Sequence, residues 1–103
     1  MEGTAKMENT RQEPQKKEPE ARVNQLIRQA QAGDERSFAM LYDGYTPLIE
    51  RLVAKFAADG IPEADLRSDA MDAFIAAAGR FDPEQKGVTF GLYARICIEN
   101  RLI

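Results

Sequence analysis

The sequence predicts an all-α domain, a small bundle of about four helices that follows a disordered N-terminal arm. Three observations lead to this prediction. From Arg22 onward, apolar residues recur at spacings of three and four, the period of a helix with one buried face. No segment alternates apolar and polar residues for long enough to form a strand. Residues 1–21 contain almost no large apolar side chains.

The sequence divides into an arm, residues 1–21, and a helical domain, residues 22–103. The arm is rich in Glu, Lys, Gln, Asn and Thr, so it cannot bury enough apolar surface to offset the entropy lost on ordering. Its acidic and basic residues nearly balance, which is not typical of a basic tail that binds nucleic acid. We therefore expect a disordered leader or linker.

Two helices are predicted in the first half of the domain. The first is short, and its apolar face consists of Val23, Leu26, Ile27 and Ala30. Gly33 is expected to end it, and Asp34 to cap the next helix. That second helix carries one long apolar stripe, made of Phe38, Leu41, Tyr42, Tyr45, Ile49, Leu52, Val53 and Phe56. Pro47 is expected to kink it and Gly60 to end it.

Two further helices are predicted, over residues 61–81 and 88–103. Pro62 suits the first turn of the third helix, and Glu63 and Asp65 suit the positive end of its dipole. The core face of the third helix consists of Leu66, Ala70, Ala73, Phe74, Ala77 and Phe81. Residues 82–87 form a turn. The inner face of the fourth helix consists of Phe90, Tyr93, Ala94, Cys97 and Ile98.

Composition argues against several functions. The net charge is -3, so no global positive field attracts nucleic acid, although a local patch still can. There is no histidine, which removes the usual general base and the commonest metal ligand. The single cysteine, Cys97, cannot form an internal disulfide and is expected to be a buried apolar residue. With no membrane span and no signal peptide in sight, we expect a cytoplasmic protein.

The outward side of the third helix is the first candidate site. It consists of Asp65, Ser68, Asp69, Met71, Asp72 and Ile75. Carboxylates around a soft apolar centre suit docking on a basic protein surface. A solvated face with two incidental apolar residues is the alternative, and spacing alone does not decide between the two.

Metal binding and catalysis are not expected. One straight helix rarely surrounds a cation alone, and no second carboxylate motif completes a shell around the three aspartates of the third helix. No nucleophile stands beside a base, and no glycine-rich phosphate loop occurs. Without a catalytic group or cofactor motif, the sequence predicts a binding protein rather than an enzyme.

The order of motifs resembles conserved region two of bacterial RNA polymerase sigma factors, from about Val23 to Ile103. The motifs are "AQAGDERSFAMLYDGYTP", the "DLRSD" helix, "FDP", "KGVTF" and "YA", in this order and spacing. The closing "CIENRLI" is closer to the alternative, sporulation-type branch. The resemblance implies an all-α domain that binds the polymerase core and takes part in promoter-dependent transcription initiation.

The resemblance also implies the roles of particular residues. The family helix that "DLRSD" resembles docks on the clamp helices of the largest β-type subunit, which assigns the outward side of the third helix to the polymerase core. The fourth helix begins the promoter-melting surface, where Phe90 and Tyr93 match aromatic residues that trap unstacked bases. From spacing alone, the same two residues are more typical of a core. The DNA-facing set is then Lys86, Phe90, Tyr93, Arg95 and Arg101.

The sequence departs from the family pattern at several positions of the turn and the fourth helix. Glu99 replaces a usual arginine, and Gln85 is an extra residue in the turn. The family's promoter-reading helix is expected after Ile103, so promoter DNA binding is predicted to be weak or to need a partner chain. The alternatives are a core-binding regulator without promoter recognition, one subunit of a split sigma factor, and a homo-oligomeric helical module. An anti-sigma partner is also compatible with the sequence.

Overall fold

A computed structural model describes residues 20–103. They form four helices and no strand: α2 (Glu20–Gln31), α3 (Glu35–Ala57), α4 (Glu63–Arg80) and α5 (Phe90–Leu102). The predicted all-α bundle is therefore confirmed for this part of the chain. The predicted disordered arm, residues 1–21, lies outside the described residues, except that Glu20 and Ala21 already belong to α2.

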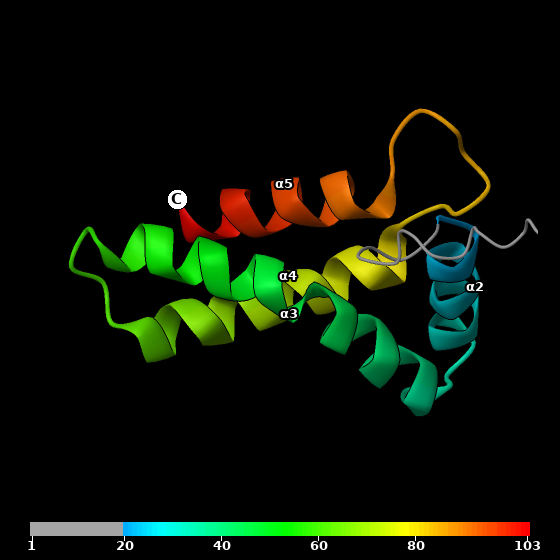
Figure 1. Ribbon diagram of the computed structural model, residues 1–103, viewed down its shortest axis with the longest axis horizontal. Coiled ribbons are helices and arrows are strands. Elements are labelled where there is room, and N and C mark those ends of the chain that lie inside the picture. The colour runs from blue at the N-terminus through cyan, green and yellow to red at the C-terminus, as the bar shows by residue number, and fades with distance from the viewer. Residues whose placement is uncertain (1–19) are drawn as a thin grey trace, which may run out of the picture.

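The helices pack around one core. α5 lies along the pair formed by α3 and α4, and α2 lies across one end of that pair (Figure 1). Within residues 20–103, no helix combines the length and the apolar content needed to cross a bilayer.

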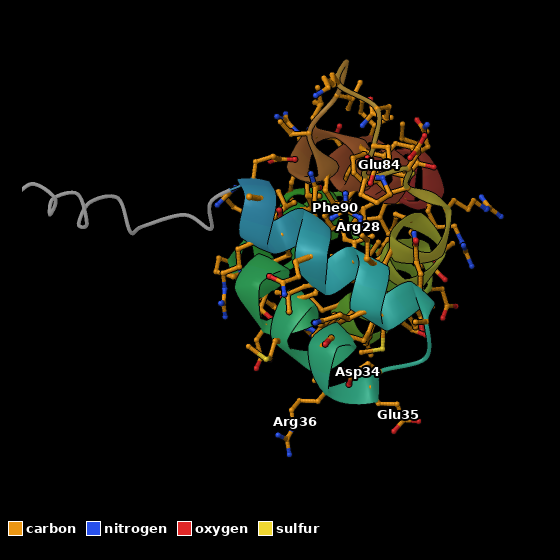
Figure 2. The ribbon with its side chains drawn as sticks, turned by 90° about the vertical axis from the view of Figure 1, so that its right-hand side faces the viewer. Arg28, Asp34, Glu35, Arg36, Glu84 and Phe90 are labelled. Carbon is orange, nitrogen blue, oxygen red and sulfur yellow. The ribbon has the colours of Figure 1, made fainter. Side chains whose placement is uncertain are left out.

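The first two helix boundaries follow the sequence signals. Gly33, two residues after the end of α2, has a φ of 102°, a left-handed conformation that favours glycine. The side chain of Asp34 accepts hydrogen bonds from the backbone N–H groups of Arg36 and Ser37, so Asp34 caps α3 as predicted (Figure 2). Pro47 lies inside α3, which changes direction near its middle (Figure 1).

Two boundaries differ slightly from the predictions. Pro62 occupies the N-cap of α4 rather than its first turn. α5 begins at Phe90, two residues later than predicted, because Thr89 caps it: the Thr89 hydroxyl accepts from the backbone N–H of Leu92 at 3.3 Å. Val88 consequently belongs to the preceding loop.

Aromatic rings fill the centre of the bundle. Phe74 of α4 is fully buried, and its ring centroid lies 5.5 Å from that of Tyr42 and 5.7 Å from that of Phe90. Phe38 and Tyr45 of α3 also pack against it, each at 5.9 Å. Most of these pairs meet edge to face, the arrangement that aromatic quadrupoles favour. All six residues predicted for the core face of α4 are buried.

We predict that Phe74→Ala destabilises the domain by about 3–5 kcal/mol, because the vacated ring volume lies between α3, α4 and α5. Leu92→Ala is the matched control: Leu92 is 47% exposed, and its truncation should change the free energy of unfolding by about 0.5 kcal/mol or less. Urea denaturation followed by circular dichroism measures both. If the two changes lowered the free energy of unfolding equally, Phe74 would not be the centre of the core.

The Asp34 cap predicts a pH dependence. The Ser37 hydroxyl, the backbone N–H groups of Ser37 and Arg36, and the nearby Arg36 charge hold the pKa of Asp34 below its usual value of 3.8. A carboxylate with a lowered folded-state pKa stabilises the fold above pH 3.8, and that contribution is lost as the pH falls through the folded-state pKa. Asp34→Asn keeps a cap acceptor without the charge. Its thermal midpoint should lie below wild type at pH 7 and approach it near pH 3; a pH-independent difference would contradict the charge effect.

Candidate functional site

The candidate docking surface lies on the outer side of α4. We call it the α4 face: Asp65, Ser68, Asp69, Met71, Asp72 and Ile75. All are exposed except Asp69, which is half-buried. Met71 is 41% and Ile75 48% exposed, although both are large apolar residues. The predicted separation of a core face and an outward face on this helix is therefore present in the fold.

The acidic character of the α4 face depends on where the neighbouring cations lie. Arg67 donates two hydrogen bonds to the Glu50 carboxylate of α3, at 2.9 and 2.6 Å, and this contact holds the pKa of Glu50 below its usual range. Arg67 is thus neutralised by Glu50 rather than by the α4 face. Arg101 of α5 does reach it, with its Nη2 3.5 Å from an oxygen of Asp72. Among residues 20–103, Arg101 is therefore the one cation that pairs with the three aspartates of the α4 face, and it pairs with Asp72.

The structure disperses the predicted DNA-facing set. Lys86 lies in the loop before α5, whereas Arg95 lies beside α3 and Arg101 reaches toward α4. Arg95 also has a carboxylate partner in its own helix, since its Nε lies 3.4 Å from an oxygen of Glu99. These cations do not form one continuous basic surface.

Phe90 requires a correction. It is fully buried, behind α2 in the view of Figure 2. Its ring packs against Phe74 and Phe81, with centroids 5.7 and 5.4 Å away, so Phe90 is not placed to stack on a DNA base. Tyr93 is half-buried, and its ring centroid lies 5.4 Å from that of Phe81. The core interpretation that spacing favoured is the one that the structure supports for both residues.

A basic groove between α3 and α5 is a feature that the sequence did not reveal. It has a volume of about 300 Å³, and its lining is Leu48, Arg51, Leu52, Lys55, Arg95 and Glu99. Glu99 is its only carboxylate and has two cations near it, Lys55 at 3.7 Å and Arg95 at 3.4 Å. Arg51 has no ion pair with any residue from 20 to 103. The groove therefore carries an excess of positive charge.

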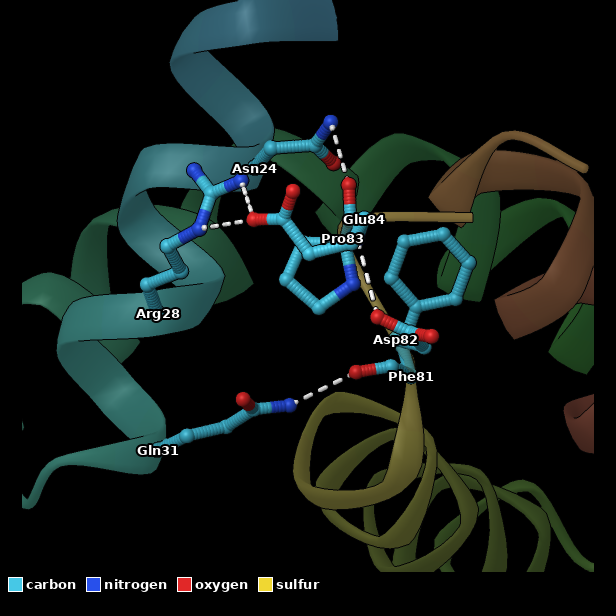
Figure 3. A network of polar contacts seen from close by, with 7 residues as sticks. All are labelled: Asn24, Arg28, Gln31, Phe81, Asp82, Pro83 and Glu84. Carbon is cyan, nitrogen blue, oxygen red and sulfur yellow. Dashed lines mark hydrogen bonds and ion pairs between the residues drawn. The ribbon is translucent and has the colours of Figure 1, made fainter. Parts of the chain in front are cut away.

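The loop between α4 and α5 is held by α2. The Arg28 guanidinium pairs with the Glu84 carboxylate, and the Asn24 amide donates to the backbone oxygen of Pro83 at 3.4 Å (Figure 3). Gln85 closes the loop on itself: its side-chain oxygen accepts from the backbone N–H groups of Gly87 and Val88. The start of α5 is thereby fixed relative to α2.

Gln31 connects α2 to the C-terminal end of α4. Its amide nitrogen donates to the backbone oxygen of Ala78 at 2.9 Å and to that of Phe81 at 2.8 Å; Figure 3 shows the contact with Phe81. These oxygens lie at the C-terminal end of α4, where the last carbonyls lack partners within the helix. A side chain from α2 thus caps α4.

No group of three or more potential ligands among residues 20–103 is arranged to hold a metal ion. Asp65, Asp69 and Asp72 share the α4 face but do not converge on one point. Comparison of the chain with family models, with curated proteins and with solved structures gives no match. Residue motifs and geometry are therefore what a functional assignment rests on.

We predict that Gln31→Ala lowers the free energy of unfolding by about 0.5–1.5 kcal/mol for each hydrogen bond lost, since two carbonyls of α4 lose their donor. Gln25→Ala is the matched control, because Gln25 is an exposed residue of the same helix that makes no such contact. Chemical denaturation measures both variants. A control that is as destabilised as Gln31→Ala would indicate a helix-propensity effect instead of a cap.

Proposed function

We propose that this chain is a sigma-factor region-two-like domain that binds the RNA polymerase core through the α4 face and takes part in transcription initiation in the cytoplasm. The observation that carries the proposal is that a sequence motif and the exposed side chains point to the same helix, α4. The "DLRSD" motif assigns core binding to α4, and the same helix exposes Met71 and Ile75 beside three aspartates.

The chemistry of the α4 face supports a protein contact. Exposed methionine and isoleucine side chains supply apolar area that gains free energy when covered, at about 25 cal/mol per Å² of buried surface. The surrounding carboxylates favour a partner rich in Lys and Arg and disfavour an acidic one. A basic helical surface, such as the clamp helices of the largest β-type subunit, has the matching properties.

A second candidate is a core-binding regulator that does not recognise promoters. It is favoured by the burial of Phe90 and by the carboxylate partners of Arg95 and Arg101. These contacts leave few groups on α5 that are free for bases or phosphates. In the first candidate, promoter contacts come from a partner chain, as in a split sigma factor.

We predict that the tagged protein retains bacterial RNA polymerase core enzyme in a pull-down and that Asp69→Arg abolishes retention. A cation at this position would face a basic partner and replace an attraction by a repulsion. Asp65→Arg, at an exposed position of the same face, should weaken retention about tenfold or more. Both variants should keep the wild-type circular dichroism spectrum.

Asp43→Arg is the matched control, since Asp43 is an exposed aspartate of α3 outside the α4 face. It should leave retention unchanged. Retention that survives both α4 variants would refute the site, and absence of retention by the wild type would refute the proposed function. Promoter-specific run-off transcription, with and without a candidate partner chain, then separates an initiating factor from a regulator.

A further inference from the structure

Exposed apolar side chains gather on two separate helix faces. Of the eight large apolar residues that are exposed within residues 20–103, two belong to the α4 face and three to α5 or the residue directly after it. We call the latter three, Leu92, Ile96 and Ile103, the α5 strip. Leu92 and Ile96 are each 47% exposed, and their spacing places all three on one side of the helix.

The opposite side of α5 is the one that packs into the bundle. Phe90, Ala94, Ile98 and Leu102 are buried there. The α5 strip therefore has no partner within the described part of the chain. Apolar residues clustered on a surface are typical of a contact with another molecule.

The two faces carry opposite charge. Next to the α5 strip along the same helix, Arg95 and Glu99 line the groove between α3 and α5. Lys55 and Arg95 pair with the Glu99 carboxylate there, and Arg51 lines the same groove. On the α4 face, three aspartates lie beside Met71 and Ile75, and within residues 20–103 Arg101 is the one cation paired with them. Each face thus offers an apolar centre, and the charges around the two centres are complementary.

We propose that the α5 strip of one copy docks on the α4 face of a second copy of this chain. Leu92 and Ile96 would cover Met71 and Ile75, and the cations of the groove would approach the aspartates. Pairing of like faces is disfavoured by charge. Two α4 faces would oppose carboxylates to carboxylates, and two α5 strips would bring two basic grooves together.

This arrangement has a defined symmetry. Because the two contacting faces differ, the interface is heterologous: in a docked pair, one copy still has its α4 face free and the other still has its α5 strip free. The association therefore extends into rings or chains of copies. Two helix faces bury less than the roughly 1,200–2,000 Å² typical of stable complexes, so we expect weak, reversible association at high protein concentration.

Self-docking covers the same α4 face that the proposed function assigns to polymerase. It stands without that function, however, because it involves this chain alone. If it occurs, polymerase core and self-association compete for one surface. An Ile96→Glu variant should then bind polymerase at least as well as the wild type. It keeps its own α4 face and loses only the α5 strip, with which it would cover the α4 face of another copy.

The test is a mixing experiment followed by light scattering at low ionic strength. Wild-type protein should gain mass with concentration, and added salt should reverse the gain because ion pairs are screened. Ile96→Glu and Ile75→Lys should each stay monomeric, with association weakened about tenfold or more. An equal mixture should form particles of two copies, because one variant keeps the α4 face and the other keeps the α5 strip.

Met40→Glu is the matched control, since Met40 is 43% exposed but belongs to neither face; it should associate like the wild type. Circular dichroism should show that all variants are folded, as expected for changes at exposed positions. The proposal is overturned if the wild type stays monomeric throughout, if Ile75→Lys still associates, if the mixture stays monomeric, or if Met40→Glu abolishes association as well.

Discussion

The packing of aromatic rings around Phe74 is the constraint on which the remaining structure depends. Rings from α3, α4 and α5 meet at this one buried side chain, so the rotation of each helix about its axis is set by where its aromatic residue points. Once Phe74 faces inward, the residues on the opposite side of α4 face solvent. The outward position of Asp69 and Ile75, on which the proposed docking depends, is in this sense a consequence of core packing.

Hydrogen bonds from α2 give the fold the directional contacts that apolar packing alone does not provide. Apolar contacts are not directional, whereas the contacts that α2 makes to the far end of α4 and to the following loop fix particular atoms. Gln31 holds two carbonyls of α4, and Arg28 holds Glu84 of the loop. The shortest helix of the described chain therefore links the helix that carries the α4 face to the helix that carries the α5 strip.

The sequence predicted the elements of the fold well because its signals are local. A helical repeat identified the buried side of α4, and Gly33 and Asp34 marked a boundary that the backbone follows. Contacts between distant segments have no such signal: nothing local places Arg51 beside Arg95.

Periodicity also put Phe90 and Tyr93 on one side of α5 without distinguishing the fully buried ring from the half-buried one. Among the candidate site residues, the composition of the α4 face was therefore predictable, and the dispersal of the basic residues was not.

The ion pair between Arg101 and Asp72 joins the end of α5 to the α4 face. Any molecule that covers Asp72 must displace this guanidinium or accept it as part of the interface. Occupancy of α4 and the availability of Arg101 are consequently linked, and thermodynamic linkage acts in both directions. An anion that captured Arg101 would leave Asp72 uncompensated and so strengthen the attraction of this helix for cations, which makes a single surface arginine a point of communication between two helices.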